Sequence, residues 1–133
     1  MANRVKLVSS TQIYLDVNAL LDHILDIVPN FPRQYKYSLG ADMQHLAVEL
    51  LDEVAAAYLI RNREIRIGHL ETFQHKFQTL KTLVRKAGER KWITSKGRHA
   101  QIIELMDAIG KQCTAWKNSL ARVSEPKPDA DEL

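Results

Sequence analysis

Basic side chains are concentrated in one stretch of the sequence, and they give the chain its clearest capacity for chemistry. Residues 72–103 contain eight lysines and arginines and a single acid, Glu89. Ammonium and guanidinium groups without nearby carboxylates can bind the phosphate oxygens of a nucleic acid or an acidic protein face. The stretch therefore predicts an anion-binding surface on a chain whose net charge is only +3. Its cations are Lys76, Lys81, Arg85, Lys86, Arg90, Lys91, Lys96 and Arg98.

The expected helix positions of these cations separate them into two groups. Cations near a helix C-terminus interact favourably with the helix dipole and the last carbonyls, which accounts for Lys86, Arg90 and Lys91 without any ligand. Lys76 and Lys81 are expected in the middle of a helix and gain nothing from the dipole. A solvated helix face is the plain alternative to a functional basic surface.

One flank of the same expected helix is suited to phosphate binding. Gln74, Gln78, Lys81 and Arg85 follow one another at spacings of four, three and four, so they share one side of a helix. This flank carries hydrogen-bond donors and no carboxylate. Arg98 is expected at the start of the next helix, where the dipole opposes a cation. The pattern favours an external partner for these charges.

A second candidate site is the segment FPRQYKYSLG, residues 31–40. Arg33 and Lys36 are expected in or just before the first turn of a helix, with Asn30 as a possible N-cap and Pro32 in the first turn. Cations are disfavoured there, so they indicate an external or inter-subunit anion held by free N–H groups and a guanidinium. A tyrosine-rich plug between helices, with solvated cations, fits the same residues equally well.

A group of acids and a histidine on one expected helix face could be imagined as metal ligands. A metal-binding bundle would project such ligands inward from several helices, and no other segment supplies matching carboxylates. The face is expected to be solvated because it lies opposite an apolar stripe. The sequence therefore predicts neither a metal nor a cofactor. These residues are Asp42, His45, Glu49, Asp52 and Glu53.

No catalytic machinery is evident in the sequence, which predicts a protein that is not an enzyme. Cys113, the only cysteine, falls on an apolar stripe with Trp116 and is expected to be a small buried hydrophobic residue. No phosphate-binding glycine loop and no nucleophile–histidine–acid pattern is present. No apolar run approaches the roughly 20 residues of a membrane span, and no signal peptide is recognisable, so we expect a cytoplasmic protein.

Four segments with helical periodicity must position these residues. Apolar side chains recur at spacings of three and four in each of them, and no long segment alternates with period two. Pro29 is expected to stop the first segment, the third is expected to end near Gly88, and Thr94 or Ser95 could cap the fourth. The segments are residues 17–28, 39–58, 67–87 and 102–120.

Short joints between long amphipathic helices predict an all-α fold, an up-down-up-down antiparallel four-helix bundle over residues 1–120. Residues 121–133, with two prolines and an acidic end, are expected to form a disordered tail. Residues 41–60 contain four acids and no lysine or arginine. Such an acidic helix could meet the basic corner of another copy head to tail, which predicts assembly into a ring.

Two sequence elements resemble a known family. The first follows the pattern F-P-[RK]-x-x-[RK]-[YF]-x-L-G, and the second follows I-G-[RK]-x-x-x-x-W-[IK]. Both resemble elements of the accessory variability determinants of diversity-generating retroelements, which are related to the bundle proteins encoded in rRNA intervening sequences. The resemblance covers about residues 15–120. The matching residues are Phe31, Pro32, Arg33, Lys36, Tyr37, Leu39 and Gly40 in the first element and Ile109, Gly110, Lys111, Trp116 and Lys117 in the second.

The resemblance implies a homopentameric barrel of positively charged four-helix bundles without enzymatic activity. Such proteins bind the reverse transcriptase of the element and its template RNA or cDNA, and they support mutagenic reverse transcription. It implies that Lys81 and Arg85 make this contact, together with Arg33 and Lys36 of the first element. The chain departs from the family in its corner RKAGERKWIT, where Trp92 could shift what the corner touches. The alternative is a self-associating protein–protein adaptor that does not bind nucleic acid.

Overall fold

The computed structural model describes residues 7–8 and 11–123, and this part of the chain is helical without a β-strand. The predicted all-α fold class is confirmed. Its elements are α1 (Gln12–Ile27), the 3₁₀ turn η2 (Val28–Asn30), the one-turn helix α2 (Arg33–Lys36), α3 (Leu39–Leu59), α4 (Arg63–Glu89) and α5 (Lys96–Val123).

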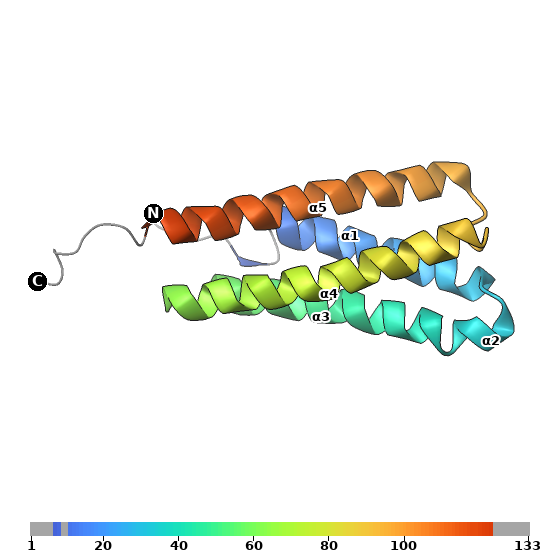
Figure 1. Cartoon of the computed structure of the whole chain (residues 1–133), viewed down its shortest axis with the longest axis horizontal. Helices are drawn as coiled ribbons and strands as arrows, with labels where there is room; N and C mark the ends of the chain where they lie inside the picture. Colours follow the sequence, from blue (N-terminus) through green and yellow to red (C-terminus); the bar gives the residue numbers. More distant parts are fainter. Residues whose placement is uncertain (1–6, 9–10, 124–133) are drawn as a thin grey trace, which may run out of the picture.

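The four long helices lie alongside one another and alternate in direction (Figure 1). α1 packs against α3 and α5, and α4 packs against the same two helices on the other side of the bundle. This arrangement confirms the up-down-up-down four-helix bundle. Assembly of several bundles into a ring remains a prediction.

The core is built from the apolar stripes of the four long helices. Leu20 of α1, Leu50 of α3, Phe73 of α4 and Ile109 of α5 are each fully buried. Phe73 also lies with its ring centroid 5.7 Å from that of Phe77, the next residue of the α4 stripe. Every buried side chain in the described part of the chain is apolar. The charged residues therefore lie on the faces and ends of the bundle, where their neighbours decide their role.

The helix ends follow some of the predicted signals. α1 begins five residues earlier than its apolar stripe suggested and ends at Ile27, directly before the turn that contains Pro29. At the start of α5 the Ser95 hydroxyl oxygen accepts a hydrogen bond of 3.1 Å from the backbone N–H of Arg98. Ser95 is therefore the predicted cap.

α4 ends at Glu89, next to Gly88, as the sequence predicted, but a residue other than glycine makes the closing turn. Lys91 takes the left-handed backbone conformation there (φ 66°). The N–H of Lys91 donates to the Gly88 carbonyl at 3.0 Å, and the N–H of Trp92 donates to the Ala87 carbonyl at 2.9 Å. This is the closing pattern usually made with glycine. Gly88 has a packing role instead, since a Cβ there would lie 2.6 Å from the His99 ring.

The entry to the second long helix also differs from the prediction. The residues from Arg33 to Lys36 form the separate helix α2, with Pro32 before it, and Ser38 precedes α3. Asn30 belongs to η2, so the predicted N-cap role of Asn30 is wrong. α3 starts close to η2, since a Cβ on Gly40 would lie 2.6 Å from Val28 Cγ1.

α5 continues through Val123, three residues beyond Leu120, the last residue of its predicted apolar stripe. The remainder of the predicted tail, and most of the N-terminal segment, lies outside the described residues. None of the helices in the described ranges has a stretch long and apolar enough to cross a membrane.

Candidate functional site

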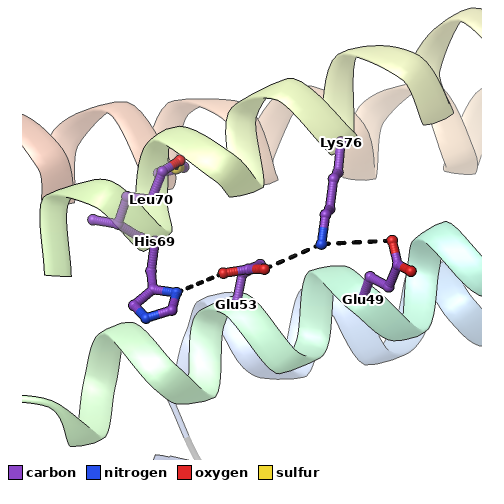
Figure 2. A network of polar contacts seen from close by, with 6 residues as sticks. Glu49, Glu53, His69, Leu70 and Lys76 are labelled. Carbon is purple, nitrogen blue, oxygen red and sulfur yellow. Dashed lines mark hydrogen bonds and ion pairs between the residues drawn. The ribbon is translucent and has the colours of Figure 1, made fainter. Parts of the chain in front are cut away.

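Lys76 lies on the side of α4 that faces α3, within a polar network between the two helices (Figure 2). Its Nζ is 3.1 Å from Glu53 Oε2 and 3.6 Å from Glu49 Oε1. The other oxygen of Glu53 is 2.7 Å from His69 Nδ1. An ionised carboxylate can only accept hydrogen bonds, so both His69 and Lys76 donate to Glu53.

The network favours the charged forms of Glu53 and Lys76. Burial by itself would raise the pKa of Glu53, but the hydrogen bonds from His69 and Lys76 outweigh it and lower this pKa below its ordinary value. The hydrogen bond to Glu53 raises the pKa of Lys76, against an opposing effect of burial. Glu53 and Lys76 therefore each stabilise the charged form of the other.

This network corrects two expectations from the sequence. The fold itself neutralises Lys76, so this lysine does not need an external anion. The acidic face of α3 is only partly solvated, because the Glu53 side chain is 15% exposed and Glu49 is 37% exposed. Asp42 and Asp52 on the same helix are exposed. The described residues contain no group of histidines, cysteines and acids that could hold a metal ion.

Lys81 and Arg85 lie on another side of α4, where they line a groove between α4 and α5 with a volume of about 990 Å³. Among the described residues, neither side chain has a carboxylate within ion-pair distance. The Lys81 ammonium lies 5.1 Å from the ring centroid of Phe77, a weak attraction that leaves its charge available. These two predicted site residues thus share the groove without an ion pair of their own among the described residues, although Glu89 and Asp107 also line it.

The floor and far rim of the groove come from α5. Ile103, which is half-exposed, and the buried Met106 provide an apolar floor. Lys111 lines the far rim and pairs with Asp107 at 3.1 Å. Lys111 was not among the predicted site residues, although it belongs to the second sequence element. The groove therefore joins cations on its α4 rim to an apolar floor.

The basic corner between α4 and α5 contains three of the predicted site residues. Lys86 pairs with Glu89 at 3.7 Å, and both side chains are more than half exposed. The Arg90 guanidinium lies 5.7 Å from the ring centroid of Trp92. Lys91 is exposed at the turn. An exposed ion pair of this kind is weak, so the corner remains available to anions.

Trp92 joins this corner to the segment that contains α2. Its ring centroid lies 5.1 Å from that of Phe31 and 4.7 Å from that of Tyr35. Arg33 and Lys36 are therefore at the same end of the bundle as the corner (Figure 1). Neither has an ion pair among the described residues. Phe31 and Tyr35 thus form the aromatic plug of the plainer alternative, with unpaired cations beside it, and binding of an anion by Arg33 and Lys36 remains a prediction.

Arg98 corrects another expectation, because it has a partner within the chain. Its Nη1 lies 3.0 Å from Asp26 Oδ2 and 3.0 Å from His23 Nδ1, both on α1. The Asp26 carboxylate thus compensates the Arg98 charge, which the dipole at the start of α5 disfavours. This pairing becomes visible only when α5 is packed against α1.

A second group of cations lies at the opposite end of the bundle, and sequence reasoning missed it. Arg61, Arg63 and Arg66 surround the turn between α3 and α4. Arg66 donates from Nε to the Ala57 carbonyl at 2.8 Å and lies 5.9 Å from the ring centroid of Trp116. Arg63 pairs with a neighbouring acid at 3.7 Å. The sequence signal that could have revealed this group is the presence of three arginines within six residues.

Cys113 is buried as predicted. Burial raises the pKa of its thiol to about 11. Its Sγ–H points to the Leu70 carbonyl at 3.8 Å, so it packs between α5 and α4 as a neutral thiol. A thiol with this pKa is a poor nucleophile at neutral pH.

Comparison with protein-family models matches residues 7–120 to the family described as bAvd-like. No curated protein matches the chain.

Proposed function

Because the chain belongs to the bAvd-like family of accessory helical bundles, we propose that it is a non-catalytic accessory subunit of a diversity-generating retroelement. In this role it binds the reverse transcriptase of the element and its template RNA or cDNA. The bundle supplies a basic surface, and the polymerase supplies the chemistry. The family match over most of the chain is the reason to prefer this role to that of an unrelated bundle.

The observation that carries the proposal is the pair of uncompensated cations in the groove between α4 and α5. Lys81 and Arg85 have no carboxylate partner among the described residues, whereas Lys76 on the same helix has two. A guanidinium and an ammonium held on one rigid helix can bind phosphates along a strand. Such interactions hold nucleic acid of any sequence, which suits a subunit that handles a template.

The test is the salt dependence of RNA binding. We expect the double variant Lys81→Ala/Arg85→Ala to bind a fluorescent RNA of about 20 nucleotides more weakly than the unmodified protein, whatever the RNA sequence. The slope of log Kd against log salt should fall by about 0.7 for each phosphate of a single strand that the variant no longer neutralises. Fluorescence anisotropy at salt concentrations from about 50 mM to about 300 mM measures this slope.

Lys76→Met is the matched control, since it removes one positive charge from the same helix. Its slope should stay close to that of the unmodified protein, because Glu49 and Glu53 already occupy this ammonium. RNA affinity that does not respond to salt, or an equal decrease of slope in the control, would contradict the proposed electrostatic surface.

We also propose that the bundle works as a closed homo-oligomer, with a pentamer as the expected form. Asp42 and Asp52 on α3 are exposed and have no ion pair among the described residues, so they are available to the cations of a neighbouring copy. Native mass spectrometry at micromolar concentration tests this. A monomer at that concentration would contradict the ring.

A second candidate function is a protein–protein adaptor, which the apolar floor of the groove favours. Ile103 and Met106 could receive the apolar face of a partner helix. Ile103→Asp should then abolish co-purification with the reverse transcriptase, while the Lys81→Ala/Arg85→Ala variant should retain it. The opposite pattern, combined with salt-sensitive RNA binding, favours the nucleic-acid role.

A further inference from the structure

Tyr37 is the most exposed of the large apolar side chains described at the α2 end of the bundle. It is 76% exposed, whereas Phe31 and Tyr35 of the same segment pack against Trp92. Its side chain makes no hydrogen bond or ring contact with any other described residue. The fold therefore gains little from an aromatic ring at this position.

The backbone that carries Tyr37 is nevertheless held firmly. The Ser38 hydroxyl donates to the Gln34 carbonyl at 3.0 Å, and the N–H of Asp42 donates to the Ser38 carbonyl at 2.9 Å. Phe31, at the start of the segment, is 3% exposed and anchors it to the core. A ring on a fixed backbone can bind a flat partner with little loss of conformational entropy.

Cations lie on the same segment and at the same end of the bundle as this ring. Arg33 is the first residue of the one-turn helix α2, and Tyr37 directly follows the last residue of that helix. Arg33 is exposed and without an ion pair among the described residues, and Arg90 and Lys91 lie at the same end of the bundle. An exposed aromatic ring on the same short segment as an unpaired guanidinium suits a ligand with both a flat ring and a negative charge.

A single-stranded nucleic acid has this chemistry, because its unpaired bases expose their faces and each is flanked by a phosphate. Base stacking on an aromatic side chain contributes strongly to single-strand binding and tolerates any sequence. A duplex hides its base faces and offers mainly phosphates. We propose that Tyr37 is a stacking platform for an unpaired base of single-stranded nucleic acid, with Arg33 holding the adjacent phosphate.

This inference rests on the proposed nucleic-acid role and specifies its ligand. The test compares Tyr37→Leu, which removes the ring but keeps an apolar side chain, with Tyr37→Phe, which keeps the ring and removes only the hydroxyl. Binding to an oligo(A) RNA of about 20 nucleotides and to an RNA duplex of about 20 base pairs is measured by anisotropy over a range of salt concentrations. Thermal unfolding checks that both variants stay folded, as expected for an exposed side chain.

We expect Tyr37→Leu to weaken oligo(A) binding about tenfold, with an unchanged salt slope and unchanged duplex affinity. Tyr37→Phe should bind both RNAs like the unmodified protein. Equal oligo(A) affinity in Tyr37→Leu, or an equal weakening for single strand and duplex, overturns the inference while leaving the electrostatic surface intact. Loss of reverse-transcriptase binding with RNA binding unchanged would also overturn it, since Tyr37 would then bind a protein. If the unmodified protein binds no nucleic acid, the proposed function fails together with this inference.

Discussion

The two sides of α4 carry similar positive charges, but these charges have different neighbours. Towards α3, Lys76 lies between two glutamates and its pKa is raised. Towards α5, Lys81 and Arg85 line an open groove and have no carboxylate partner among the described residues. The charge on the first side helps to join α4 to α3, whereas the charges on the second side are in no ion pair with a described residue and are available to another molecule.

The comparison shows why a count of cations does not locate a binding surface. Desolvating a charge is costly unless a partner compensates it, so a half-buried lysine at a helix–helix seam needs an acid from the neighbouring helix. Arg85 is exposed and has no such requirement, whereas Lys81 is half-buried and has the Phe77 ring, 5.1 Å away, in place of an acid. Charges at the seam should therefore affect stability, and charges in the groove should affect binding.

The largest expected effect comes from breaking the seam. Glu53→Ala removes the acceptor for both His69 and Lys76 and leaves Lys76 with Glu49 alone. We expect a decrease of about 2–3 kcal/mol in the free energy of unfolding. Urea denaturation at a fixed protein concentration measures it. Glu104→Ala removes an exposed acid of α5 that has no ion pair among the described residues; it is the control and should change stability by less than about 0.5 kcal/mol.

The pH dependence of the seam should be the next largest effect. Because the folded-state pKa of Glu53 lies below its ordinary value of 4.5, its contribution is present above that pH and is lost as the pH falls through the lower folded-state value. Because the pKa of Lys76 is raised above 10.5, its contribution is present below that pH and is lost only as the pH rises through the higher folded-state value.

The stability difference between the unmodified protein and Glu53→Gln should thus be about 1–2 kcal/mol near neutral pH. It should shrink as the pH falls below 4.5 through the lower folded-state pKa of Glu53, where the carboxyl becomes protonated. Urea unfolding at several pH values tests this, with Glu104→Gln, a change at an exposed acid of α5, as a variant that should give a small and flat difference. A difference that grows as the pH falls below 4.5 would show that the sign of the coupling is wrong.

The smallest expected effect on stability lies in the groove. Arg85→Ala and Lys81→Ala should each change the free energy of unfolding by no more than about 0.5–1 kcal/mol, the upper value for Lys81 because it lies over Phe77. Their effect should instead be on the salt dependence of RNA binding. A destabilisation as large as that of Glu53→Ala would mean that the groove is also a structural element.

Much of the fold was predictable because its signals are local. Apolar residues at spacings of three and four identified the four long helices, and Pro29 and Ser95 marked ends that the structure confirms. Features that depend on tertiary packing were not predictable. α4 ends near Gly88 as predicted, but Lys91 takes the left-handed conformation after it, and the close approach of Gly88 to His99 appears only in the structure.

The sequence by itself determined the helical stripes, the abundance of cations and the segments that carry them, since each depends on neighbours a few residues apart. Only the tertiary structure decided which cations remain free. Lys76 meets Glu53 across 23 residues of chain, and Arg98 meets Asp26 across 72. Such pairs depend on how helices are rotated and shifted against one another. That arrangement is set by packing of the whole core, so local periodicity does not contain it.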